Sequence, residues 1–168
     1  MTENICPVGA WEVHDTFAPV LPKSAPLHLD TWYLDGAHAQ ITLLISSTRA
    51  APRCPGCHAP ARHIHSRYTR TLADLPWSGY AITWRLRVRT LLCHNRTCPR
   101  RIFTERLPGL VAPWARRTLR LAARLLAIGL ALGGAAGARL SQSLGLPVSR
   151  NTLLRVIRRT PCPVMVAP

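Results

Sequence analysis

Two closely spaced cysteine pairs constrain the fold of this chain more than any other feature of its sequence. Cys54 and Cys57 are separated by Pro-Gly, and Cys93 and Cys98 are separated by four residues. Each pair fits on a tight turn and offers two thiolates, so together they supply the four ligands of a tetrahedral Zn²⁺. A shell closed by four thiolates has no open position for a substrate. We therefore expect a structural zinc whose binding is coupled to folding.

Other interpretations of these cysteines stay open on sequence grounds. Cys54 and Cys57 could form the dithiol of a thiol oxidoreductase, and with His58 they also have the spacing of a haem attachment motif. The cysteines could also be incidental. We interpret Cys6 and Cys162, which lie far from both pairs, as free thiols. A histidine could replace one of the four ligands, and four lie nearby: His58, His63, His65 and His94.

The charge of the chain points to a polyanionic partner. Its 168 residues include 22 Lys and Arg against 7 Asp and Glu, which gives a formal net charge of +15 at pH 7. No acidic residue follows Glu105, so the last third of the chain is strongly positive. Such a surface attracts nucleic acid through its phosphates, and we expect the chain to bind it.

Residue patterning predicts an α+β protein, with a small β-rich zinc-binding module at residues 28–107 followed by an all-α helix-turn-helix module at residues 114–160. Residues 1–27 are expected to form a loose leader, and residues 161–168 a tail.

Within the first module, the β-rich runs at 29–34 and 40–46 flank Asp35-Gly36, which predicts a β-hairpin. Arginines alternate with apolar residues over 80–89, so one face of that strand should be basic. This basic face would either follow a phosphate backbone or be solvated.

The second module has the pattern of two helices joined by a short turn. Gly145 suits the left-handed position that ends a helix, and Ser149 suits the N-cap of the next one. Leu153, Leu154 and Ile157 form an apolar stripe on this last helix. In the preceding helix the apolar stripe is expected to comprise Leu121, Leu125, Ile128 and Leu132.

The basic side of the last helix predicts DNA contact, although an ordinary helical hairpin with a solvated basic face has the same pattern. Arg150, Asn151 and Arg155 lie near the N-terminal end, where a recognition helix reads base edges. Arg158 and Arg159 are expected on phosphates. The other DNA-binding candidates are Arg117, Arg120 and Arg124, which share one face of the preceding helix.

The order of these motifs resembles the N-terminal part of the ISL-three family of insertion-sequence transposases. The resemblance rests on the Cys54-x-x-Cys57 pair, on the segments 68–79 and 93–105, and on Ser149-Arg-Asn-Thr-Leu-Leu-Arg155. It covers roughly residues 28–161. It implies a zinc-binding domain and a helix-turn-helix that bind the terminal inverted repeats of the element. In the family, a downstream ribonuclease-H-like domain with three metal-binding carboxylates then cuts and joins DNA.

This sequence departs from that pattern because it ends at Pro168 without a later group of acids. Two-metal phosphoryl chemistry needs clustered carboxylates. We therefore expect a truncated or split transposase that is not an enzyme alone, with the catalytic domain absent. The resemblance assigns Asp74 and Glu105 to structure. The expected partners are double-stranded DNA at transposon ends and either a separate catalytic transposase chain or a second copy in a homodimer.

Residues 1–7 lack the pattern of a secretory signal, and the apolar stretch 121–138 contains Arg124 and a Gly-Gly pair. We expect a soluble, cytoplasmic, nucleoid-associated bacterial protein with no membrane partner. The functional alternatives are a stand-alone zinc-containing helix-turn-helix transcriptional regulator and a thiol oxidoreductase using Cys54 and Cys57. A further alternative is the remnant of a decayed element.

Overall fold

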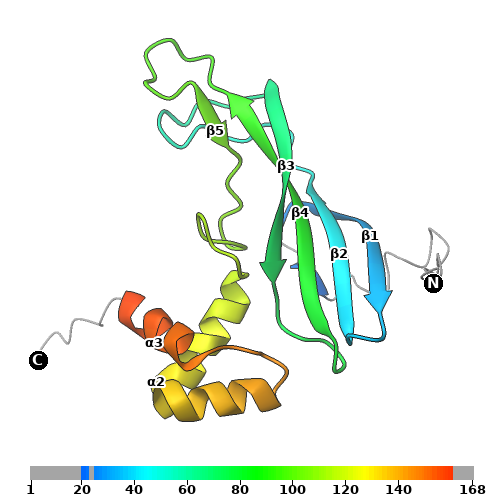
Figure 1. Cartoon of the computed structure of the whole chain (residues 1–168). Helices are drawn as coiled ribbons and strands as arrows, with labels where there is room; N and C mark the ends of the chain where they lie inside the picture. The colour runs from blue at the N-terminus through cyan, green and yellow to red at the C-terminus, as the bar shows by residue number, and fades with distance from the viewer. Residues whose placement is uncertain (1–19, 23–24, 161–168) are drawn as a thin grey trace, which may run out of the picture.

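The computed structural model of the chain describes residues 20–22 and 25–160, so the expected tail and most of the expected leader lie outside the described residues. Figure 1 shows a twisted sheet with the helices beside one of its ends. The elements in chain order are β1 (Leu27–Asp35), β2 (Gln40–Ser47), β3 (Ile64–Ala73), β4 (Ala81–Leu92), β5 (Ile102–Thr104), α2 (Leu119–Ser143) and α3 (Arg150–Arg159).

The sheet is organised around β4, the longest of its strands. Its strand order is β1-β2-β4-β3, and β5 pairs with the end of β4. β1 and β2 form an antiparallel pair with Asp35 opposite Gln40, which confirms the predicted hairpin. β2 and β4 are parallel, an arrangement that local patterning did not predict. β4 therefore joins the hairpin at one end of the sheet to β5 at the other.

The two faces of β4 differ as the alternating sequence predicted. Trp84, Leu86 and Val88 are buried, whereas Arg85 and Arg87 are exposed. Residues directly opposite each other on an antiparallel pair share a face. On β3, Arg67 lies opposite Arg89, and Thr69 and Thr71 lie opposite Arg87 and Arg85. One face of the sheet is consequently basic and rich in threonine.

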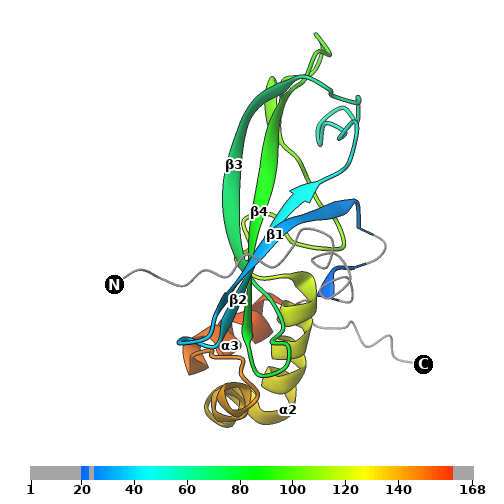
Figure 2. The same cartoon turned by 90° about the vertical axis from the view of Figure 1, so that its right-hand side faces the viewer.

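The apolar face of the sheet is covered by the segment between β5 and α2, which the sequence analysis left without a structure. Leu107, Leu110 and Val111 from this segment belong to the same buried cluster as Leu43 and Trp84. Figure 2 shows that the chain after β5 passes on one side of the β3–β4 pair. This segment thus completes the core of the sheet and leads into the helices.

The helix α2 is interrupted at Gly133, whose φ of 71° and ψ of −162° are not helical. Leu121, Leu125 and Ile128 are buried as predicted. The expected burial of Leu132 is wrong, because its side chain is 45% exposed where the first helical piece ends. The direction of the chain changes at Gly133, so the apolar stripe does not continue through it.

By length and composition alone, the 25 residues of α2 are long and apolar enough to cross a membrane. Within the described structure, α3 packs closely across both pieces of this helix. A Cβ atom at Gly134 would lie 2.9 Å from Cγ of Leu154, and one at Gly129 would lie 3.1 Å from the Ile157 side chain. The glycines therefore allow an approach between the helices that larger residues would prevent.

A buried ion pair joins the sheet to the start of α2. Asp74 follows β3, and its carboxylate accepts hydrogen bonds from Nε of Arg120 at 2.8 Å and from Oγ1 of Thr118 at 2.6 Å. The Arg120 guanidinium also donates to the carbonyl oxygen of Val20 and lies 5.7 Å from the centre of the Trp84 ring. We therefore exclude Arg120 from the residues proposed to contact DNA, because its guanidinium is hydrogen-bonded to Asp74 and Val20 within the protein. Asp74 has a structural role, as the resemblance implied.

We predict that Asp74→Ala destabilises the protein by about 2–3 kcal/mol, because it leaves the Arg120 guanidinium half-buried without its counter-charge. Urea unfolding of the zinc-loaded chain measures this change. Asp35→Ala is the matched control, since the Asp35 carboxylate is exposed and pairs with His38 on the surface. The control should leave the unfolding midpoint almost unchanged, and equal effects of the two substitutions would contradict the structural role of Asp74.

Candidate metal centre

Two turns at the end of the sheet far from α3 carry the four cysteines (Figure 1). In the first turn, the backbone N–H of His58 donates to the carbonyl of Cys54 at 2.9 Å, and the N–H of Cys54 donates to the carbonyl of Ala59 at 2.9 Å. His58 has a φ of 59°, in the left-handed region that such a tight turn requires. In the second turn, the backbone N–H of Cys93 donates to the carbonyl oxygen of Arg101 at 2.8 Å. These backbone bonds set the direction of the thiols.

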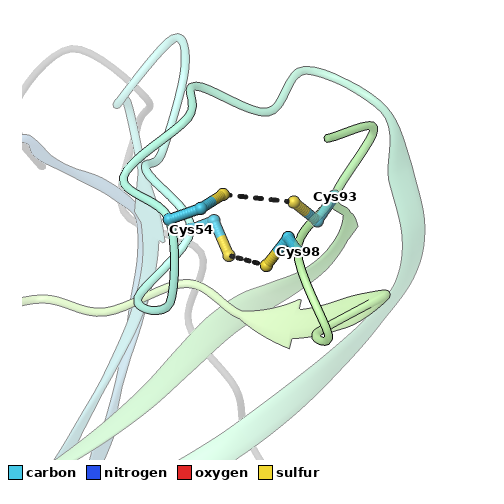
Figure 3. Close-up of side chains that lie close together, drawn as sticks. Cys54, Cys93 and Cys98 are labelled. Carbon is cyan, nitrogen blue, oxygen red and sulfur yellow. Dashed lines mark hydrogen bonds between the residues drawn. The ribbon is translucent and has the colours of Figure 1, made fainter. Parts of the chain in front are cut away.

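The four sulfur atoms come together in one group. All four Sγ atoms lie within 4.8 Å of one another, with 3.9 Å between Cys54 and Cys98 and 3.6 Å between Cys57 and Cys93. Figure 3 shows the side chains pointing toward a common centre. A tetrahedral zinc with Zn–S bonds of about 2.3 Å places its sulfurs about 3.8 Å apart. The observed separations therefore fit a four-thiolate zinc shell, and all four cysteines are free thiols.

The turns also modify the acidity of these thiols. The backbone N–H of Ala59 donates to the Cys57 sulfur and lowers the pKa of this thiol to about 7. The backbone N–H of Asn95 lowers the pKa of Cys93, but burial and the neighbouring thiols outweigh it and raise that pKa to about 12. Four adjacent thiolates repel one another unless a cation neutralises them. A divalent ion at the centre supplies that neutralisation and holds all four as thiolates.

The cysteines make up much of the small core in this part of the molecule. Cys54, Cys93 and Cys98 are buried together with Leu91 and Phe103. A cluster this small buries little apolar surface, so a metal is needed to stabilise it. Cys6 and Cys162 lie outside the described residues.

Among the described residues, the four cysteines are the single group suited to hold a metal ion. The histidines that sequence reasoning kept as substitute ligands, His58, His63, His65 and His94, are all exposed and outside this group. The haem and dithiol alternatives treat Cys54 and Cys57 as a separate pair, which does not fit four converging thiols.

The predicted DNA-binding residues lie at the opposite end of the sheet (Figure 1). Leu153 of α3 is fully buried against α2. Arg124 is exposed and Arg117 is half-buried, and neither forms an ion pair with a described residue. The exposed polar residues of α3, which also lack ion pairs with described residues, are Arg150, Asn151, Arg155, Arg158 and Arg159.

Arg67, which the sequence pattern did not identify, joins Arg85 and Arg87 on the basic face of the sheet. All three side chains are exposed. The one signal that could have found Arg67 is the register of β3 against β4, and this register is not visible in either strand alone.

Residues 50–98 match the family model described as the zinc-finger of transposase IS204/IS1001/IS1096/IS1165. The match contains all four cysteines, although it covers less than a third of the chain. Searches of curated proteins and of solved structures gave no match. The matched family and the converging thiols together confirm the expected structural zinc, and Cys54, Cys57, Cys93 and Cys98 are positioned to bind it. The match also confirms the resemblance over these residues and relates the chain to transposases.

We predict that zinc binding at pH 7 releases more than two but fewer than four protons, because Cys93 and Cys98 have raised pKa values and are protonated there, whereas Cys57 is about half ionised and the pKa of Cys54 is lowered. Protons compete with zinc, so the affinity should fall steeply as the pH is lowered through 7. Calorimetric titration in buffers with different ionisation enthalpies counts the protons.

Cys57→Ser is the matched variant, since it removes the most acidic of these thiols. It should weaken zinc binding and lower the number of released protons by less than one, because the Cys57 thiol is already partly ionised at pH 7. Release of two protons or fewer by the unaltered chain would mean that fewer than four thiols bind the metal.

Proposed function

We propose that this chain is a DNA-binding part of a transposase that recognises the terminal inverted repeats of its own insertion element. The observation that carries this proposal is the exposed row of basic residues on α3, which form no ion pair with a described residue, on a chain that also contains a transposase zinc finger. We further propose that the second piece of α2 and α3 act as a helix-turn-helix, with α3 entering the major groove.

The turn and caps between the two helices support this arrangement. Gly145 has a φ of 71° just after α2 ends, a conformation that favours glycine. The Ser149 side chain accepts a hydrogen bond from the N–H of Thr152 at 3.3 Å and caps the first turn of α3. A Cβ atom at Gly137 would lie 3.1 Å from the Leu153 side chain, so the helices are closely packed. α3 is therefore held by its apolar side and presents its basic side outward.

The exposed residues of α3 divide by their position along the helix. Arg150, Asn151 and Arg155 are nearer the N-terminus, where side chains reach base edges. Arginine pairs well with guanine and asparagine with adenine. Arg158 and Arg159 lie in the last turn and would contact phosphates. Arg117 and Arg124 would extend the phosphate contacts along the start of α2.

The described carboxylates do not form a two-metal catalytic site. Asp74 and Glu105 are buried in ion pairs with Arg120 and Arg89, while Asp30 and Asp35 are on β1 beside histidines. The proposal therefore assigns DNA binding to the described part of the chain, and it assigns cleavage and strand transfer to carboxylates elsewhere. A separate catalytic chain or a second copy is the proposed protein partner, in the bacterial cytoplasm near the nucleoid.

We predict that Arg155→Ala and Arg158→Ala weaken DNA binding in different ways. Loss of a base contact at Arg155 should reduce the binding free energy by about 1–3 kcal/mol for a duplex that contains the element's end repeat, and by much less for a scrambled duplex. Loss of a phosphate contact at Arg158 should weaken the binding of both duplexes. It should also lower the magnitude of the slope of log K against log salt concentration by about one. Fluorescence anisotropy at several salt concentrations measures both effects.

Arg96→Ala is the matched control, because Arg96 is an exposed arginine in the second cysteine turn, far from α3. Equal losses in all three variants would mean that net charge, not α3, determines binding, and would contradict the proposed recognition helix. Footprinting then separates the two DNA-binding functions. Protection of the element's ends supports the transposase role, whereas protection of a host promoter alone would indicate a transcriptional regulator.

A further inference from the structure

Trp114 is the most exposed large hydrophobic residue of the described chain, with an exposed fraction of 88%. It lies between β5 and α2 and has a φ of 62°, in the left-handed region that bulky residues avoid. An exposed indole on a strained backbone contributes nothing to the core and carries a conformational cost. Such a position indicates that the ring is kept for a partner.

The backbone around Trp114 is fixed on both sides. Val111 is packed into the core of the sheet. The guanidinium of Arg70 donates to the carbonyl of Ala115 at 2.6 Å, and the N–H of Ala73 donates to the carbonyl of Arg116 at 2.9 Å. The loop is thus hydrogen-bonded to β3, and the backbone that carries the indole is held in place. Little ordering would be needed before a ligand stacks on it.

A cavity of about 480 Å³ is lined in part by Trp114. Its lining also includes the half-exposed side chains of Tyr68 and Ile102 and buried residues of the sheet such as Val88. A cavity of this size suits a small ligand such as a nucleotide.

The rim of this cavity is cationic. Arg70, Arg100 and Arg116 line it. Glu105 is the one acid among the lining residues, and it is buried and paired with Arg89 at 2.9 Å. The arginine charges at the rim are therefore not neutralised within the cavity, which suits an anionic ligand.

From these features we infer that the cavity binds one unpaired nucleotide of DNA, with its base stacked on Trp114 and its phosphate beside Arg100 and Arg116. Aromatic side chains beside cationic groups are the usual means of holding unpaired bases. A base inside a duplex is covered on both faces by its neighbours, so only an unpaired one can stack in this way. The inference rests on the proposed DNA binding and adds that the chain distinguishes unpaired from paired DNA.

The test uses the zinc-loaded full chain and two DNA probes. One probe is a fully paired duplex, and the other is the same duplex with a single unpaired 2-aminopurine. We expect at least about fivefold tighter binding of the second probe, with quenching of the 2-aminopurine fluorescence when the base stacks. Unchanged fluorescence, or equal affinity for the two probes, would overturn the inference.

Three variants localise the effect. Trp114→Gly should abolish both the preference and the quenching, and it should not unfold the chain because glycine adopts a positive φ without strain. Trp114→Phe should keep most of the preference, since an aromatic face remains. Trp77→Ala is the matched control on another exposed tryptophan and should behave as the unaltered chain. If Trp114→Gly weakened the binding of both probes equally, Trp114 would contact paired DNA instead, and the inference would be refuted.

The design separates this inference from the proposed function. If neither probe binds, the proposed DNA binding fails and the cavity inference fails with it. If the paired duplex binds through α3 without any preference for the unpaired base, the cavity inference alone fails. A peptide with acidic and aromatic residues provides a further comparison. If it displaces the paired and unpaired probes equally, and the 2-aminopurine fluorescence is not quenched in either case, the cavity binds a protein partner and the inference is overturned.

Discussion

The convergence of four thiols is the constraint on which the end of the sheet depends. One cysteine turn precedes β3 and the other follows β4, and the apolar residues buried with them are too few to hold them together. Without a cation, ionisation of one thiol opposes ionisation of the next, and burial together with the neighbouring thiols raises the pKa of Cys93. A bound zinc converts this repulsion into four metal–sulfur bonds and fixes the connection between β4 and β5.

The scarcity of acids shapes both the interior and the surface. Asp74 and Glu105 are buried, and each pairs with one arginine at a junction of the fold. These pairs neutralise Arg120 and Arg89, and the other described arginines form no ion pair with a described acid. The positive surface therefore remains where α3, the open sheet face and the Trp114 loop meet solvent. A protein with more surface acids could have the same fold but a weaker attraction for polyanions.

The helical part shows how small residues allow one helix to pack closely against another and leave its basic side exposed. Gly133 interrupts a helix that would otherwise continue in one direction, and Gly129, Gly134 and Gly137 let α3 lie close against both pieces. The apolar stripe of α3 is covered by this packing, so its basic side faces outward by default. The same break exposes Leu132, which a straight helix would bury.

The sequence by itself determined the features that depend on near neighbours in the chain. The Cys-Pro-Gly-Cys turn predicted the zinc site, alternation in β4 predicted its buried and basic faces, and Gly145 with Ser149 predicted the turn before α3. These signals are local because turn conformation, strand alternation and helix caps involve residues a few positions apart. The ligand set was also predictable, since zinc chemistry limits the choice of side chains.

Only the tertiary structure decided which distant residues meet. Arg120 and Asp74 are 46 residues apart, and nothing in the local pattern distinguishes Arg120 from Arg124, which stays exposed. The parallel pairing of β2 with β4 and the exposed indole of Trp114 likewise follow from how the chain closes on itself. Local periodicity specifies which side of an element is apolar, but the partner that covers it is selected by packing and charge over the whole fold.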